Sequence, residues 1–233
     1  MASSVQRPVI LVGLEGNIGA GKTSLLDYAR LIPNVAVLYE NEIAWRNQNG
    51  QDLLAHYYRS PQQHAATFQF VIQRYQALDM RVAVQEAQRN HSVLVTERTP
   101  AAGEIFIKEA RARGQLDKVA YDSLIEGTDM LNREFRYQHI IYLFTSYEQA
   151  YERTNKRRQD REKEGRYEPL VPKSHVKNLH ERYEKWIQTK EKDPDVTVHV
   201  IHGNSNLVDV EKELAQILHN IMIHEDSLYA ETK

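Results

Sequence analysis

No cysteine occurs among the 233 residues, which excludes a disulfide framework, a thiolate metal site and a cysteine nucleophile. A charge excess of either sign is also lacking, because 30 basic and 32 acidic residues leave a formal charge of −2. That is too little to hold the chain on nucleic acid or on an anionic membrane. No apolar run is long enough for a membrane span or a signal-peptide core. We therefore expect a soluble, cytoplasmic protein with neither nucleic acid nor membrane as a partner; a mitochondrial presequence trimmed earlier would leave no trace.

The size and composition favour a single domain over residues 1–233. With 41% hydrophobic residues the chain can bury one sizeable core. It contains no internal repeat and no linker rich in proline, glycine or serine. One tract departs from ordinary composition, the charge-dense RTNKRRQDREKEGRYE at residues 153–168.

Five short runs rich in β-branched residues predict buried strands, at residues 9–13, 35–39, 92–96, 139–144 and 197–201. The segments between them have helical spacing, and the longest runs from about residue 61 to residue 89. Alternating apolar strands and helices indicate an α/β fold with a parallel sheet covered on both faces.

The segment directly after the first predicted strand has the G-x-x-x-x-G-K-[ST] pattern of a phosphate-binding loop, and a helix-forming stretch follows it. In such a loop the backbone N–H groups surround a phosphate, the lysine reaches the β and γ oxygens, and the threonine hydroxyl can hold Mg²⁺. A glycine-rich turn that binds nothing is a much weaker reading. The predicted ATP-binding residues are Gly16, Asn17, Ile18, Gly19, Ala20, Gly21, Lys22, Thr23 and Ser24.

The end of the third predicted strand bears on whether water or a substrate hydroxyl accepts the phosphate. A GTPase or motor usually carries a DxxG or DE signature there, whereas this chain has Glu97 and Arg98. Glu97 can help to hold the waters of Mg²⁺, and Arg98 can reach phosphate or a substrate oxygen. Taken alone, the pair is equally compatible with a structural ion pair.

Glu40 follows the second predicted strand directly. Because the carboxyl ends of parallel strands line the ligand crevice of an open α/β sheet, Glu40 should face the phosphate loop and could act as a base. A solvated loop glutamate is the alternative.

The long predicted helix carries two amides among apolar residues, and helical spacing places Phe68, Gln69, Ile72 and Gln76 along one side. From periodicity alone, core packing is the more frequent meaning of such a stripe. A buried glutamine, however, offers a donor and an acceptor in one plane, as pairing with a base edge requires.

Together these residues resemble the deoxyribonucleoside kinase family. The resemblance rests on GNIGAGKTS, ENEIAWRNQNGQDLL, YYRSP, TFQF, ERT, AGEIF, AYERTNKR and VPKSHVKNLHERYEKW. It implies a P-loop kinase fold with a five-stranded parallel sheet flanked by helices and an arginine-rich lid. It also implies that Glu40 is the general base on the 5′-hydroxyl, that Lys22 and Arg98 assist, and that Thr23 and Glu97 serve Mg²⁺. The implied nucleoside contacts are Gln69 with the base, Tyr58 with the 3′-hydroxyl, Phe106 stacked on the base, and Ile18, Trp45, Phe68 and Ile72 as walls.

By the same resemblance, the charge-dense tract belongs to a lid over about residues 153–172. Arg157 is the firmest match to the arginines that contact the donor phosphates, followed by Arg153, Arg158 and Arg161. The lid glutamate that contacts the sugar is Glu168 in preference to Glu162. A solvated helical surface remains an alternative for most of these charges.

The sequence departs from the family pattern in places that bear on the substrate. Glu40 precedes Asn41 where the family commonly has Glu-Pro, and Pro100 should open the helix after ERT. Members that favour deoxycytidine or purines carry an arginine and an aspartate at positions that match Gln76 and Ala102 or Gly103 here. Of these, Gln76 and Ala102 are the predicted substrate contacts. The resemblance is therefore to thymidine-accepting and broad-specificity members, with deoxycytidine as a second substrate.

The expected activity is transfer of the γ-phosphoryl group of Mg·ATP to the 5′-hydroxyl of a deoxynucleoside by a homodimer. A nucleoside monophosphate kinase, or another small-molecule kinase with a P-loop, is the first alternative, although it would need extra arginines for the acceptor phosphate. A non-enzymatic ATP-binding regulator is the second.

Overall fold

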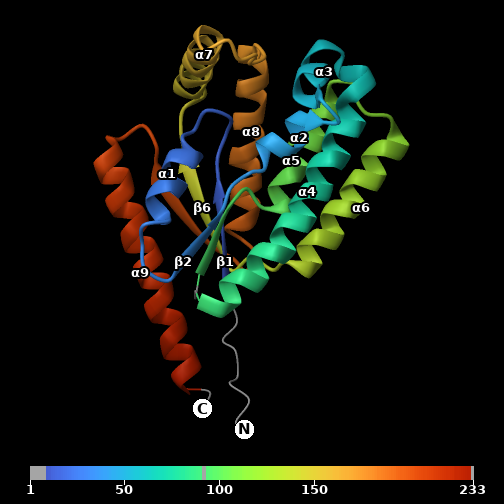
Figure 1. Cartoon of the computed structure of the whole chain (residues 1–233). Coiled ribbons are helices and arrows are strands. Elements are labelled where there is room, and N and C mark those ends of the chain that lie inside the picture. Colours follow the sequence, from blue (N-terminus) through green and yellow to red (C-terminus); the bar gives the residue numbers. More distant parts are fainter. Residues whose placement is uncertain (1–8, 91–92, 232–233) are drawn as a thin grey trace.

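In the computed structural model, residues 9–90 and 93–231 are described, without the side chains of Trp45 and residues 225–231. Five strands form one parallel sheet in the order β2-β5-β1-β6-β7 (Figure 1). Their bounds are β1 Ile10–Glu15, β2 Val35–Leu38, β5 Val93–Glu97, β6 His139–Phe144 and β7 Thr197–His202. All five predicted strands are confirmed, and so is the α/β fold. A two-stranded ribbon that the sequence did not predict is formed by β3 Asn47–Gln48 and β4 Gln51–Asp52.

Nine helices occur within the described ranges (Figure 1). They are α1 Lys22–Ala29, α2 Glu42–Arg46, α3 Leu53–Arg59, α4 Pro61–Asn90, α5 Pro100–Ala112, α6 Lys118–Glu134, α7 Tyr147–Lys163, α8 Lys173–Lys190 and α9 Leu207–Glu231. In that same part of the chain, no helix combines the length and the apolar character that crossing a bilayer requires.

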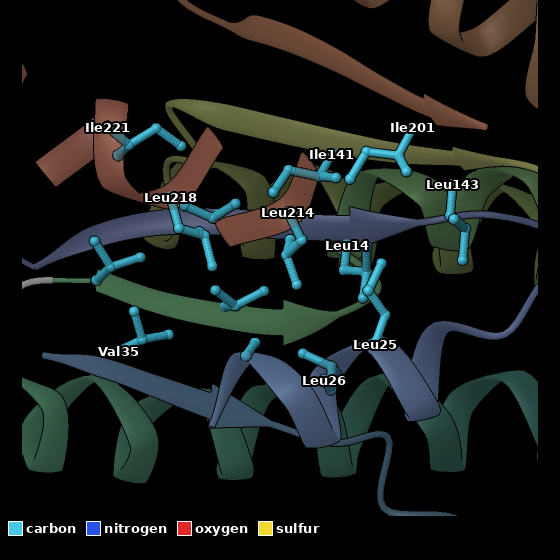
Figure 2. Packing of buried hydrophobic residues seen from close by; sticks show 14 of the residues in the cluster. Leu14, Leu25, Leu26, Val35, Ile141, Leu143, Ile201, Leu214, Leu218 and Ile221 are labelled. Carbon is cyan, nitrogen blue, oxygen red and sulfur yellow. The ribbon is translucent and has the colours of Figure 1, made fainter. Parts of the chain in front are cut away.

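One face of the sheet is covered by α1 and α9 (Figure 1). Figure 2 shows Leu25 and Leu26 of α1, and Leu214 and Leu218 of α9, packed over the strand residues. Because side chains alternate along a strand, Leu14 and its neighbours at every second position supply this core. The cluster fixes α1, and therefore the loop before it, against the sheet.

The other face carries α4, α5, α6 and α8 (Figure 1). Met80 of α4 packs with Leu11 and Leu94, whereas Ile105 of α5 and Tyr183 of α8 pack with strand β6. Helix α6 buries Leu124 and Leu131 in this layer, while its Met130 is exposed. The apolar positions of α6 therefore serve the core for the most part.

Helix α5 begins where the sequence predicted. Thr99 is its N-cap, with Oγ1 accepting a hydrogen bond from the Ala102 N–H at 3.1 Å, and Pro100 occupies the first turn. The start of this helix directly after β5 brings Arg98 to the carboxyl ends of the strands. The predicted lid corresponds to the second half of α7 and the segment that leads into α8.

Candidate active site

A cavity of about 520 Å³ opens at the carboxyl ends of β1, β2 and β5. The phosphate loop forms one side, helices α4 and α5 form the opposite side, and α7 contributes to a third. A deep, partly apolar cleft with a few convergent polar groups is the usual form of a small-molecule site. The loop residues that line it are Ile18, Gly19, Gly21, Lys22, Thr23 and Ser24.

The loop takes its shape from glycines with positive φ. Gly19 has φ of 78°, and a Cβ there would lie 2.3 Å from the carbonyl oxygen of Ala150 in α7. Gly21, with φ of 106°, is the N-cap of α1 and aims the N-terminal N–H groups of that helix at the cavity. The backbone is therefore prearranged to bind an anion.

Lys22 is buried, and its Nζ donates hydrogen bonds to the carbonyl oxygens of Gly16 at 3.2 Å and Asn17 at 3.1 Å. Burial lowers the pKa of Lys22 to about 8, and the positive charge of Arg98 acts in the same direction. An anion at the loop would favour the charged form of this amine.

Three predicted loop residues, Gly16, Asn17 and Ala20, lie behind the lining rather than in it. The buried Asn17 side chain donates to the carbonyl oxygen of Val176 in α8 at 2.9 Å. The Ala20 carbonyl oxygen accepts a hydrogen bond from Arg153. These contacts hold the loop from outside, because their polar groups are already engaged with protein.

Thr23 and Glu97 lie next to each other, with Thr23 Oγ1 3.3 Å from Glu97 Oε1. Lys22 Nζ is 3.9 Å from the same carboxylate oxygen. A hydroxyl and a carboxylate beside a phosphate site are the oxygen ligands that Mg²⁺ uses together with phosphate and water. The donor set present here therefore fits a nucleotide-borne Mg²⁺.

Glu40 lines the cavity, and its Oε2 is 3.4 Å from Arg98 Nε. Arg98 is one of three non-glycine residues with positive φ in the described part of the chain, at 68°, and its guanidinium lies 4.6 Å from the centre of the Phe106 ring. Burial by itself would lower the pKa of Arg98, but Tyr183 and Glu40 outweigh that effect and raise it. Arg98 is therefore a permanent cation between the proposed base and the loop.

Glu15 and Tyr183, neither of which was predicted as a site residue, hold Arg98 and the residue after it in place. Glu15 at the end of β1 is fully buried and accepts hydrogen bonds from the Thr99 N–H at 2.6 Å and from the Tyr183 hydroxyl at 3.4 Å. Arg98 Nη1 in turn donates to the Tyr183 hydroxyl. Burial raises the pKa of Glu15 to about 7, against the opposing charge of Arg98. A carboxylate inside the apolar run VILVGLE was the available signal for Glu15.

The predicted nucleoside side of the cavity includes Ile18, Tyr58, Phe68, Gln69, Ile72, Gln76 and Phe106. Phe68 stacks on Tyr57 with ring centres 4.8 Å apart. Gln69 is buried, and no hydrogen bond from its side-chain amide to another described residue occurs. Its amide therefore has hydrogen-bonding capacity available for a ligand. The predicted role of Trp45 falls on a side chain outside the described residues.

The prediction that Ala102 contacts the substrate is wrong. Ala102 is fully buried among Ile140, Tyr142 and Tyr183, because its position on α5 faces the sheet. The next residue, Gly103, lines the cavity instead, and a Cβ added there would meet open space.

Asn41 occupies the position at which the family that the sequence resembles commonly has proline, and its side-chain hydrogen bonds restrain the backbone in place of a proline ring. Its Oδ1 accepts from the Ala44 N–H at 3.2 Å and caps α2, and its Nδ2 donates to Asp79 of α4 at 2.9 Å. The segment after Glu40 is therefore tied to the helix on the far side of the cavity.

The four predicted lid arginines lie in different environments. Arg153 donates to the carbonyl oxygens of Ala20 at 2.8 Å and Gly203 at 2.9 Å. Arg157 lines the cavity and forms an ion pair with Glu168 at 3.1 Å. Arg158 and Arg161 do not line it, contrary to their predicted role. Arg158 pairs with Glu162 of the next helical turn, and Arg161 pairs with Glu42 and Glu168.

The two candidates for the sugar-contacting lid glutamate also differ in position. The side chain of Glu168 is 2% exposed and lines the cavity. That of Glu162 is 50% exposed and lies outside the lining. The geometry therefore favours Glu168.

Comparisons with known proteins place these observations in a family. The family model described as deoxynucleoside kinase matches residues 12–224. The chain is 29% identical over 180 residues to human mitochondrial thymidine kinase 2, a match that covers 76% of this chain and 64% of that protein, or less than two thirds of its length. It is 30% identical to the thymidine kinase of ictalurid herpesvirus 1, over 76% of this chain and 74% of that protein. It is 27% identical to the probable deoxycytidine kinase of fowlpox virus, over 94% and 89%.

Proposed function

Because the chain belongs to the deoxynucleoside kinase family, we propose that it transfers the γ-phosphoryl group of ATP to the 5′-hydroxyl of thymidine and related pyrimidine deoxynucleosides. The observation that carries this proposal is the position of Glu40. Its carboxylate lines the same cavity as Lys22 and the phosphate loop, and it is paired with Arg98.

In the proposed mechanism, the loop N–H groups and Lys22 hold the donor phosphates, and Glu40 accepts the proton of the attacking hydroxyl. Because the transition state of phosphoryl transfer is loose, alignment and charge neutralisation contribute most of the rate, and the base adds a factor of about 10² to 10⁴. Thr23 and Glu97 would hold Mg²⁺, which neutralises charge on the β and γ oxygens when it is bound. The ion pair with Arg98 holds the Glu40 carboxylate at the cavity, close to the acceptor.

The substrate preference rests on the absence of a charged pair at Gln76 and Gly103. An amide and a glycine place no charge at these two lining positions, and the glycine leaves open space beside it. Gln69 has a free amide to pair with the base edge, and Phe68 with Ile72 supplies apolar walls. The related proteins include both thymidine kinases and deoxycytidine kinases, which agrees with a pyrimidine pocket.

A panel assay of ADP release tests this proposal. We expect turnover with thymidine and deoxycytidine that exceeds turnover with ribonucleosides and with thymidylate. Preference for thymidylate would instead indicate a monophosphate kinase, and ATP binding with no nucleoside-dependent turnover would indicate a regulator. Glu40→Gln in the same panel separates the intrinsic activity from a contaminating kinase.

We also propose a homodimer formed through α4 and α6. Leu78 and Val82 of α4 and Met130 of α6 are exposed apolar side chains, and the Arg81–Glu134 ion pair joins the two helices beside them. Sedimentation analysis should give a mass near twice 27.1 kDa. A monomer at micromolar concentration would contradict this assembly.

A further inference from the structure

Glu168 is a buried carboxylate that faces three arginines. Arg161 Nη1 is 2.6 Å from Glu168 Oε2, and Arg46 Nη2 donates to the same oxygen. Arg157 Nη2 lies 3.1 Å from Glu168 Oε1. A charge that is 2% exposed needs such partners, because an unpaired buried carboxylate would be strongly unfavourable.

Arg46, at the end of α2, joins more segments than the other two arginines. Its Nε lies 2.7 Å from Glu42 Oε1, and its Nη1 lies 3.6 Å from Asp52 and 3.3 Å from the carbonyl oxygen of Tyr167. Its remaining Nη2 reaches Glu168. The side chain is 16% exposed, so these interactions are partly shielded from water. Arg46 therefore links helix α2, the start of α3 and the segment that follows the lid helix.

The two oxygens of Glu168 are used differently. Oε2 is occupied by Arg46 and Arg161, whereas Oε1 has Arg157 as its single partner among the described side chains. Arg157 lines the cavity together with Glu168, and its side chain is 44% exposed. Arg153 also lines the cavity, but its guanidinium is bound to the carbonyl oxygens of Ala20 and Gly203. Oε1 is thus the oxygen with capacity for a ligand hydroxyl, and Arg157 is the cation able to turn toward a phosphate.

We propose that Arg46 is a positioning residue that fixes Glu168 across the cavity, so that the nucleoside-side helix α2 and the arginine lid act as one unit. The proposal rests on the proposed function for the identity of the ligand. Arg46 holds Oε2 in place, a sugar hydroxyl donates to Oε1, and Arg157 is released toward the donor phosphates.

The charge balance of the cluster is compatible with this exchange. Three guanidinium groups face three carboxylates, those of Glu42, Asp52 and Glu168. When Arg157 turns to a phosphate, Glu168 keeps Arg46 and Arg161, so its buried carboxylate stays paired. Without Arg46, Glu168 Oε2 would keep Arg161, and the link between α2 and the lid would rest on the ion pair between Glu42 and Arg161.

A double-mutant cycle on thymidine binding tests the proposal in the full-length chain. Arg46→Met keeps the length of the side chain and removes its charge, and Glu168→Gln keeps the shape of the carboxylate. We expect Arg46→Met to raise the Kd of thymidine roughly tenfold in the wild-type background and less than about twofold in the Glu168→Gln background. An equal effect in both backgrounds would mean that Arg46 acts through Glu42 or Asp52, and would overturn the proposal.

A second measurement does not depend on activity. Hydrogen exchange of residues 164–172 without ligand should accelerate in Arg46→Met and stay unchanged in Arg166→Met, which removes an exposed charge from the same segment. Unchanged exchange in Arg46→Met would overturn the inference even if the wild-type enzyme phosphorylates thymidine. If exchange accelerates but the wild-type chain phosphorylates no deoxynucleoside, the proposed function fails and the role of Arg46 in holding the lid stands.

Discussion

The phosphate loop and the lid face each other across one cavity, but different forces hold them. The loop is fixed by backbone conformation and by hydrogen bonds of buried groups such as Lys22 and Asn17. The lid is fixed by ion pairs that partly exposed arginines, among them Arg157 and Arg161, form with the buried Glu168. Salt screens exposed charges and leaves buried hydrogen bonds nearly unchanged. The loop is therefore built as a rigid anion site, and the lid as an element that can exchange its partners.

The largest effect is expected on the loop side, at the carboxylate opposite the phosphate. Glu40→Gln should lower kcat by about 10² to 10⁴, because the attacking hydroxyl loses its base, while the Kd of thymidine changes little. Steady-state kinetics with direct nucleoside titration measures both. Glu104→Gln, which removes a partly exposed carboxylate that is paired with Lys108 and lies outside the cavity lining, is the matched control. Turnover of Glu40→Gln close to wild type would contradict the base assignment.

Gly19 in the phosphate loop and Gly165 in the lid have similar φ values, but only Gly19 is closely packed, so alanine at each position tests the contrast between loop and lid. In Gly19→Ala the new Cβ would lie 2.3 Å from the Ala150 carbonyl oxygen, so the loop must shift and ATP affinity should fall at least roughly tenfold. In Gly165→Ala, with φ of 71°, no atom lies within 4 Å of the new Cβ. Both variants should lose about 1–2 kcal/mol of stability from the positive φ.

Titration calorimetry with an ATP analogue and thermal unfolding separate the two effects. Gly165→Ala should keep its ATP affinity within about twofold, because its strain lies away from the phosphate. A similar loss of ATP affinity in both variants would mean that the loop is no more rigid than the lid.

The sequence predicted the loop side well because its signals are local. The ends of the five strands agree with the predicted runs to within two residues, and the glycine pattern identified the loop between β1 and α1. Glu15 was missed because its partners, Thr99 and Tyr183, lie 84 and 168 residues away. The prediction of Ala102 as a substrate contact failed because one residue of helical register decides which residue of α5 faces the cavity, and that residue is Gly103.

The lid was predicted less well, for a physical reason. A helix with charges at most positions offers each arginine several possible partners, and only the three-dimensional arrangement selects among them. Arg46 illustrates this, since it lies 122 residues from Glu168 in the chain. Nothing in the neighbouring residues of the sequence, Trp45 and Asn47, indicates that Arg46 forms several ion pairs.

The buried carboxylate beneath the loop should make stability depend on pH. The pKa of Glu15 is raised to about 7 from an ordinary value of 4.5, so the stability linked to its protonation is fully present below about pH 4.5 and is lost as the pH rises through about 7. His139 and His175, with pKa values lowered to about 4, act in the opposite direction, so the comparison must be between variants.

Glu15→Gln cannot ionise and keeps an acceptor for the Thr99 N–H. We expect its Tm relative to wild type to rise between pH 5 and pH 8 by a few degrees, on the order of 1 kcal/mol. Thermal unfolding across this range measures the difference. A difference in Tm that stays constant with pH would mean that Glu15 does not titrate in this window.

The smallest effect is expected within the lid, where neighbouring arginines are not equivalent. Arg157→Met should raise the KM for ATP roughly tenfold, because Arg157 lines the cavity and can reach a phosphate. Arg158→Met should change it less than about twofold, because Arg158 lies outside the cavity lining and pairs with Glu162. Equal changes of KM in the two variants would mean that the lid attracts ATP through its summed charge. In that event, added salt should strongly reduce the change of KM in both variants. Unequal effects would mean that the partners chosen by each arginine, rather than the number of arginines, determine how the lid contacts the donor.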